Sequence, residues 1–536
     1  MADQELVRGP WDKVNVLTFD GGGVRGYYSL LHLDKLMECI AEEEHRLNRE
    51  AADDVPPEAL SSFSPHPMPE HVNHRSTAPP VQASFLPCHY FDYISGTSTG
   101  ALISIMLGRF RMSTYDCLGE YERLAGRVFG QPRKINEMTF LGMLNLTKRN
   151  KFSTTNLELA IKDVVRRRGE KAIHRDSAED IFFGTLRGTC RAMVFIRRTT
   201  LSSEGASLHK PYIFRSYDNF RLAPNPGGHP QPARTSDPNA PKHTRRSTTL
   251  PVWKLARAAT AAQFYFKPLL IALDDSEVIR NSKQEKKKLA SGNVAEYTDA
   301  GVDRVNNPSQ AVYKELRTAL THSKKIETWV SVGTARGTKK DERRLLGFLK
   351  SKIHAAGDTE EVDAAMREAS VIGTPEYKGP FNYYRLNDSE GLPDLPMDDW
   401  EPSSTGETTL RQMRESFQQY YNRQDVHAYF RKCAAELVTI RRARVQADPS
   451  FWERYALGTT YTCRETHCKY EPDMTWEYKD MFKTHLRNDH NLTADADTER
   501  ACRSGTLRWE YKGPEVEAAA PAARRANTSF NGFFSG

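Results

Sequence analysis

A serine between two glycines is the first residue of this sequence whose surroundings suggest chemistry. The segment G-T-S-T-G places Gly96 two residues before Ser98 and Gly100 two residues after it. This spacing is typical of a nucleophile elbow, a sharp turn between a strand and a helix that exposes a serine hydroxyl. An apolar strand pattern starts at Phe91–Ile94, and Ala101–Leu107 predicts a buried helix whose N-terminal amides point at the serine. The alternative is a structural turn with a capping serine.

A glycine-rich loop near the N-terminus is the second candidate. The segment D-G-G-G-V-R-G at 20–26 follows an apolar strand pattern, Val14–Phe19, and precedes a helical pattern. A dinucleotide site would need an acidic residue at a strand end about 20 residues on, but Glu42–Glu44 lies inside the helical pattern. A phosphate loop would need Gly-Lys-Ser/Thr, which does not follow. Two interpretations are left, a tight packing turn or an oxyanion hole whose backbone N–H groups bind a developing negative charge.

A serine nucleophile needs a base, because its hydroxyl barely ionises at neutral pH. Histidine is the usual base, but a buried carboxylate within hydrogen-bond reach can serve if desolvation raises its pKa. Asp299 follows a polar loop and precedes Ala300-Gly301. An Asp beside a Gly is also a common loop turn. Chemistry alone does not choose Asp299 over Asp303, Asp274 or Asp275.

The elements that would position these residues follow an α/β pattern, because apolar runs alternate with amphipathic stretches through about the first 335 residues. The helix after the glycine loop carries its apolar residues on one face. Further helices are predicted from the capping box Thr155-x-x-Glu158 and from Pro251 before Trp253–Ala262. Besides the strands named above, we expect strands at Arg191–Ile196 and Thr328–Val332. The apolar face of the first helix comprises Leu30, Leu33, Leu36, Met37 and Ile40.

The chain divides into regions of different composition. We expect one α/β domain over 12–335, interrupted by insertions near 51–87 and 222–250 that are rich in proline and polar residues. Residues 340–445 are charged and helical in pattern, with a long helical stretch at Leu410–Arg444, and form a predicted extension. Residues 493–536 predict a disordered tail.

Composition excludes several classes of protein. Hydrophobic residues make up 38% of the 536, enough for a real core, and no apolar run approaches the roughly 20 residues of a transmembrane helix. The first residues show no secretory signal. Lys and Arg number 76 against 69 acidic residues, and a net charge of +7 over this length does not mark a nucleic-acid protein. Eight cysteines are too few for a disulfide scaffold, so we expect a reducing, intracellular location.

Four residues near the C-terminus have the types of a zinc site. Cys463-x4-Cys468 is followed by His485-x4-His490, within a predicted module at 460–492. The gap of sixteen residues between Cys468 and His485 exceeds the usual twelve or so. Trp476 and Phe482 still fall where finger modules place their apolar core. The alternative is two free thiols and two surface histidines.

This segment does not predict DNA reading. The helix positions that would face bases are Tyr478, Met481 and Thr484. None is an Arg, Asn or Gln suited to bidentate base contacts. A structural zinc or a protein partner is the expected role.

Taken together, four blocks make the chain resemble the patatin-like phospholipase family, particularly its fungal intracellular members. The glycine loop resembles the family's D-G-G-G-x-R-G, and the elbow resembles its G-T-S-x-G. The segment from Leu255 to Pro268 is similar to its A-R-A-T-S-A-A-P-x-x-F-x-P, although Gln263 stands where proline is common. The fourth block, Asp299-Ala300-Gly301 with Asn306-Asn307-Pro308, is similar to its D-G-[GA] and N-N-P ending. The resemblance covers residues 14–335.

The resemblance implies a three-layer α/β sandwich with a mostly parallel central sheet, and a serine hydrolase that acts on lipid acyl esters without a cofactor. Ser98 would be the nucleophile and Asp299 the base. Arg25 would support the oxyanion loop or neutralise charge near it. One departure is Ala300 where the family has glycine, which implies a different loop arrangement. The implied oxyanion hole comprises Gly21, Gly22, Gly23, Val24, Arg25 and Gly26.

Two other functions stay open at this stage. One is a non-catalytic patatin-like scaffold with a zinc-finger interaction module. The other is an α/β-hydrolase with a histidine base such as His322 or His354. Under the leading hypothesis the partners are phospholipid or neutral lipid and, transiently, a membrane surface, so the location is cytoplasmic or peripheral on membranes. Basic clusters at 166–168 and 286–288 could meet anionic headgroups, although solvated surface charge is the simpler explanation.

Overall fold

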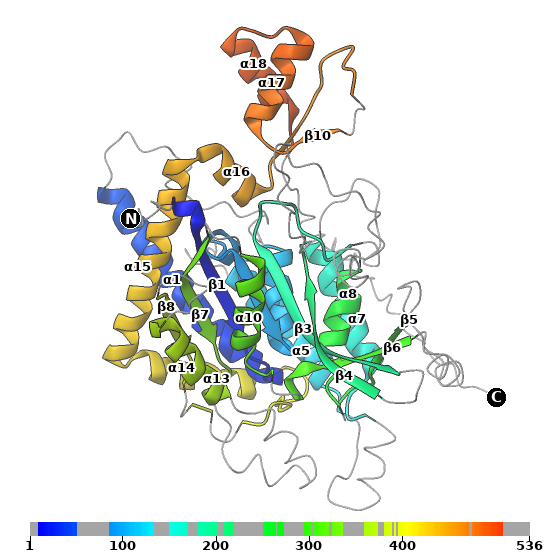
Figure 1. The fold of residues 1–536 in the computed structure, drawn as a ribbon. Coiled ribbons are helices and arrows are strands. Elements are labelled where there is room, and N and C mark those ends of the chain that lie inside the picture. The colour runs from blue at the N-terminus through cyan, green and yellow to red at the C-terminus, as the bar shows by residue number, and fades with distance from the viewer. Residues whose placement is uncertain are drawn as a thin grey trace, which may run out of the picture.

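The computed structural model contains a three-layer α/β/α domain and a small C-terminal module (Figure 1). The predicted insertions near 51–87 and 222–250 lie almost wholly outside the residues that the structure describes. So do the alternative carboxylates Asp274, Asp275 and Asp303 and the alternative bases His322 and His354. The described residues are 9–50, 85–132, 150–169, 181–201, 207–217, 250–263, 265–272, 294–302, 305–320, 324–335, 359–372, 380–388, 391–392, 395–470 and 474–507.

An eight-stranded mixed sheet forms the centre of the domain. Its strands follow the order β5-β6-β3-β2-β1-β7-β8, and β4 also pairs with β3. Strands β3, β2, β1, β7 and β8 are mutually parallel, whereas β4 and β6 run antiparallel to β3, and β5 antiparallel to β6. The strands are β1 (Lys13–Phe19), β2 (Tyr93–Thr97), β3 (Arg191–Leu201), β4 (Ser207–Arg215), β5 (Leu269–Ala272), β6 (Val294–Asp299), β7 (Lys325–Val332) and β8 (Asn382–Leu386). The predicted α/β class and mostly parallel sheet are confirmed.

Helices cover both faces of this sheet (Figure 1). Alternation along β1 sorts the side chains, since Val14 and Val16 belong to one core cluster while Leu17 and Phe19 belong to the other. The Val14 side packs on α10 (Ser309–Ala319) and α13 (Thr359–Ile372). The larger cluster on the Leu17 side holds α1 (Gly26–Glu50), α4 (Thr99–Ser104), α5 (Thr114–Phe129), α7 (Thr154–Arg168), α8 (Val252–Ala259), α14 (Glu407–Tyr421) and α15 (Gln424–Ala447).

Several predicted elements shift slightly in the structure. The apolar stripe of the first predicted helix is wholly buried in α1. The cap of α7 is Ser153, whose hydroxyl accepts the Asn156 amide, so the predicted capping box at Thr155 is displaced. The helix predicted at 101–107 divides into α4 and a π-helical turn, η4 (Ile105–Arg109). Shorter elements are η1 (Pro10–Asp12), η2 (Gly23–Arg25), α3 (Pro87–Tyr90), η6 (Ala300–Val302) and α16 (Pro449–Leu457).

The predicted domain boundary at 335 is wrong. Residues 340–445 contribute β8, which pairs in parallel with β7, so this region belongs to the central sheet. Helix α15 packs along α1, and Glu44 in α1 is wholly buried against Arg441 and Arg442 of α15. A buried carboxylate needs such partners. The predicted extension is therefore an integral part of the domain.

A separate module follows α16. Its three-stranded sheet, in the order β10-β9-β11, packs on two helices around Tyr461, Trp476, Phe482 and Leu486. The disordered tail predicted from 493 is wrong for its first part, because α18 and β11 occupy 495–507. The later residues lie outside the described part of the chain. The elements of the module are β9 (Thr460–Thr462), β10 (Thr475–Trp476), α17 (Lys479–His490), α18 (Asp495–Gly505) and β11 (Thr506–Leu507).

Among the helices that the structure describes, none combines the length and the apolar character needed to cross a bilayer.

Candidate active site

Ser98 lies at a strained turn between β2 and α4. Its backbone has φ 56° and ψ −125°, a region that side-chain-bearing residues rarely adopt. Neither flanking position has room for a side chain, so both must be glycine. A Cβ on Gly96 would lie 2.1 Å from the Gly100 carbonyl oxygen, and one on Gly100 would lie 2.6 Å from the Phe19 carbonyl oxygen. Ser98 is partly exposed although its neighbours are buried. The turn therefore has the geometry of a nucleophile elbow.

Asp299 ends β6 at the place where β2 also ends. Strand β4 occupies one edge of β3 from Met193 to Leu201, so both β2 and β6 must use the opposite edge. On that edge Thr97 pairs with Phe195, and Asp299 pairs with the next residue, Ile196. The carboxyl ends of β2 and β6 therefore meet head to head, and Ser98 follows immediately after Thr97.

Asp299 is buried, and the loop after it is compact. The Gly301 amide donates to Asp299 Oδ1 at 2.8 Å, which fixes the orientation of the carboxylate. Ala300 is buried at the start of η6 and does not adopt a positive φ. The substitution of alanine for the family's glycine thus costs no backbone strain here.

The glycine loop lies beside the elbow, and most of its amides are occupied. The Gly22 amide donates to Thr99 Oγ1 at 3.2 Å, and the Val24 amide donates to the Met397 carbonyl at 2.7 Å. Within the described residues the structure gives the Gly23 amide no protein acceptor. Among the described residues, Gly23 therefore has the loop amide that is left available to a bound group. The other three amides of the loop, those of Gly21, Arg25 and Gly26, donate to the carbonyls of Asn306, Gly22 and, for Gly26, of Gly23 and Val24.

Residues 81–312 match a family model described as patatin-like phospholipase. By this match the α/β domain is patatin-like. Calcium-independent phospholipase A2-gamma from Homo sapiens is 24% identical over 355 residues, which are 65% of this chain and 32% of that protein. The Mus musculus protein of the same name is 25% identical over 356 residues, with the same coverage. This chain spans about a third of the length of these relatives.

The patatin-like domain extends beyond the matched residues. Strand β1, which precedes residue 81, lies in the sheet between β2 and β7 and leads directly into the glycine loop. Strand β8, which follows residue 312, extends the same sheet beyond β7. The domain therefore includes strands on both sides of the matched residues 81–312.

Two residues that the sequence did not single out hold Gly23 in place. The Tyr121 hydroxyl on α5 donates to the Gly23 carbonyl at 2.5 Å. Gly23 has φ +58°, and a Cβ there would lie 2.0 Å from the Met397 carbonyl oxygen. Helix α5 and the segment before α14 thus hold the Gly23–Val24 peptide group, which adjoins the peptide group that carries the Gly23 N–H.

Tyr121→Phe is expected to lower kcat for acyl ester hydrolysis about fivefold and to leave KM nearly unchanged. The variant keeps the ring but removes the hydrogen bond that orients Gly23, and one such bond contributes about 1 kcal/mol. Steady-state kinetics with a thermal melt checks it. Tyr115→Phe, on the same helix but partly exposed, is the matched control. Wild-type kinetics in Tyr121→Phe would show that Gly23 needs no such support.

Asn306 joins three parts of the candidate site. Its carbonyl accepts the Gly21 amide at 3.1 Å. Its Oδ1 lies 3.2 Å from the point where a Cβ on Gly301 would stand and 2.6 Å from that point on Gly21. Ser98 Cβ lies 2.9 Å from the same point on Gly21. The N-N-P block therefore lies between the glycine loop, the elbow and the Asp299 loop.

Arg385 of β8 forms a buried ion pair with Asp20, the first residue of the glycine loop. Its two terminal nitrogens lie 3.0 and 2.6 Å from the two Asp20 oxygens, and both side chains are almost wholly buried. Burial raises the pKa of the Asp20 carboxyl, and Arg385 opposes that shift. No motif in the sequence pointed to Arg385, because the pair spans 365 residues.

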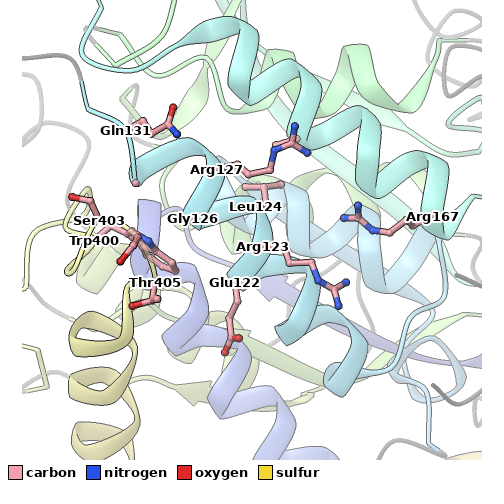
Figure 2. A pocket seen from close by; sticks show the side chains of 13 residues that line it. Glu122, Arg123, Leu124, Gly126, Arg127, Gln131, Arg167, Trp400, Ser403 and Thr405 are labelled. Carbon is pink, nitrogen blue, oxygen red and sulfur yellow. The ribbon is translucent and has the colours of Figure 1, made fainter. Parts of the chain in front are cut away.

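One pocket in the described residues is separate from Ser98 and Asp299. It has a volume of about 610 Å³ and lies on α5, between α7 and residues 400–405. Figure 2 shows Trp400 and Ser403 on one side of it and Arg167 on the other. Its arginines have carboxylate partners, with Arg123 and Arg167 both on Glu120. Neither Ser98 nor Asp299 lines this pocket.

The basic cluster at 166–168 is paired with acidic side chains. Arg166 lies 2.7 Å from Asp163, and Arg168 is buried against Asp116 and Glu120. This cluster is therefore not a row of unpaired surface cations. The other cluster, at 286–288, lies outside the described residues.

Four side chains in the C-terminal module converge on one point. The ligand atoms of Cys463, Cys468, His485 and His490 all lie within 4.8 Å of one another. They are the four residues that the sequence singled out as zinc ligands.

Proposed function

We propose that this chain is a serine-dependent lipid acyl hydrolase of the phospholipase A, lysophospholipase or acylglycerol lipase type. The observation that carries the proposal is the strained, partly exposed Ser98 at an elbow where the carboxyl ends of β2 and β6 meet. The patatin-like domain and the relatives named phospholipase A2 support a lipid substrate. The substrate is a phospholipid or neutral lipid, met at a membrane surface.

The proposed mechanism uses a Ser98–Asp299 dyad. Asp299 accepts the hydroxyl proton as Ser98 Oγ attacks the acyl carbonyl carbon, and the Gly23 amide stabilises the oxyanion. The tetrahedral intermediate collapses, the leaving alcohol takes the proton from Asp299, and an acyl-enzyme is left on Ser98. Water, deprotonated by Asp299, then attacks the acyl-enzyme, and the fatty acid is released as Ser98 Oγ takes the proton back from Asp299.

A fluorophosphonate probe and a lipid panel test this function. The folded chain should react with the probe at Ser98, located by peptide mass spectrometry, and should release fatty acid from phospholipid vesicles or emulsified acylglycerol. Heat-unfolded chain is the control, because the reactivity of Ser98 depends on the folded elbow. A folded chain that neither reacts at Ser98 nor releases fatty acid would favour the rival, a non-catalytic scaffold.

Asp299→Asn is expected to lower kcat by about 10²- to 10⁴-fold, the usual contribution of a general base. The fold should survive, because an asparagine Oδ1 can still accept the Gly301 amide that Asp299 accepts. Ester hydrolysis and the thermal melt are measured together. Asp425→Asn, at an exposed position of α15, is the control. Full activity in Asp299→Asn would exclude this residue as the base.

A further inference from the structure

We propose that the C-terminal module binds one structural zinc ion through Cys463, Cys468, His485 and His490. Two of these ligands come from the segment after β9, and two come from the second half of α17. The ion would thus link the strand side of the module to its helix. This proposal is independent of the catalytic function proposed above.

Two of the separations between the four ligand atoms are those of a tetrahedral zinc site. Zinc–sulfur and zinc–nitrogen bonds of about 2.3 and 2.0 Å place tetrahedral ligands roughly 3.5 Å apart. Cys463 Sγ lies 3.3 Å from His490 Nε2, and Cys468 Sγ lies 3.7 Å from His485 Nε2. The two cysteines are not joined in a disulfide. Two thiols and two imidazoles at these distances form a complete Cys2His2 set.

The orientation of His485 supports metal binding. Its Nε2 faces the cysteines, while its Nδ1 lies 2.7 Å from Asp489 Oδ2. Metal-binding histidines commonly donate their second ring N–H to a carboxylate, which fixes the tautomer and the ring direction. Asp489 is in turn held by Lys469 at 2.5 Å. His485 Nδ1 thus already has the carboxylate partner that is typical of a metal-binding histidine, and Nε2 is directed at the cysteines.

The module needs such a link because its core is small. The core cluster comprises six buried residues, among them Trp476, Phe482 and Leu486. Domains well below 70 residues seldom reach adequate stability from so little apolar burial and commonly use a metal or disulfides. Since the cysteines are unbridged, a metal is the available means.

Contacts with the patatin-like domain favour a structural role over DNA binding. Arg454 of α16 donates to the Arg187 carbonyl, ahead of β3, at 3.1 Å and also pairs with Glu477 of the module. Tyr478, one of the positions that would read bases, stacks on Phe451 of α16. The zinc-bound module would therefore be seated on the patatin-like domain through α16.

Metal analysis of the full chain tests the proposal. Chain purified without added chelator should carry about one zinc per molecule, and chain stripped of metal should bind Co²⁺ with the visible absorption of a tetrahedral Cys2His2 site. Cys468→Ser and His490→Gln should lose most bound metal. Asp489→Asn should weaken metal binding about 10- to 100-fold, because it removes only the partner of His485.

Two matched controls lie within the same module. His467→Asn changes a histidine next to Cys468 but outside the cluster, at a positive φ that asparagine tolerates, and Cys502→Ala removes a cysteine outside the cluster. Both should keep wild-type metal content. Absence of zinc with no tetrahedral Co²⁺ spectrum in the wild type would overturn the proposal, and so would unchanged metal content in the ligand variants. Because the readout is metal content, failure here leaves the hydrolase proposal untouched.

Discussion

Ser98→Ala is expected to lower acyl ester hydrolysis by about 10⁴-fold or more, while the folded structure is retained. The variant removes the oxygen that is proposed to form the acyl-enzyme, and the proposed base Asp299 has no hydroxyl left to activate. Alanine keeps the Cβ that serine already has, so the strained backbone at this position is not made worse. Initial rates on a fluorogenic acyl ester, with fluorophosphonate labelling, measure the effect.

A serine in the helix that follows Ser98 serves as the control for this variant. Ser104 is buried in α4, where its hydroxyl donates to the Gly100 carbonyl at 2.8 Å, and Ser104→Ala should keep most of the activity. Hydrolysis that persisted undiminished in Ser98→Ala would show that another group, or another protein in the preparation, is responsible. Loss of activity in both variants to the same extent would indicate damage to the elbow and not loss of the nucleophile.

Local patterns in the sequence predicted several elements around the candidate active site. The strand predicted at Val14–Phe19 is β1, which begins one residue earlier, and the apolar stripe from Leu30 to Ile40 is buried in α1. Glycine spacing located the turn at Ser98, because the crowding that requires Gly96 and Gly100 comes from the turn itself and from the strand next to it. Such features depend on neighbours within a few residues or on one buried face, and therefore leave a mark in the sequence.

Features that depend on distant partners could not be predicted in this way. Strand β8 has five residues in a charged region, so its place beside β7 was missed and the domain boundary was set too early. The meeting of β2 and β6 depends on how three strands share β3, which the order of motifs does not specify. Tyr121 and Met397 support Gly23 from two separate segments, and neither belongs to a recognisable motif.

Arg385→Met is expected to destabilise the patatin-like domain by about 3–5 kcal/mol, the usual cost of leaving a buried charge without its partner. Asp20 would keep its burial but lose the guanidinium that contacts both of its oxygens. For a domain of several hundred residues this corresponds to a Tm lowered by roughly 3–5 °C. Activity should fall as well, because Asp20 begins the loop that holds Gly23. A thermal melt and steady-state kinetics on the same sample measure both.

The double variant Asp20→Asn with Arg385→Met separates a charge effect from simple loss of packing. Asparagine carries no charge, so the double variant should be more stable than Arg385→Met alone, although it has one more substitution. Arg367→Met provides a matched control, because Arg367 pairs with Asp363 on α13 with its side chain half exposed and should contribute less than about 1 kcal/mol. If the two single effects simply added in the double variant, the ion pair would not be what holds the start of the glycine loop, and Arg385 would act through its packing in the core.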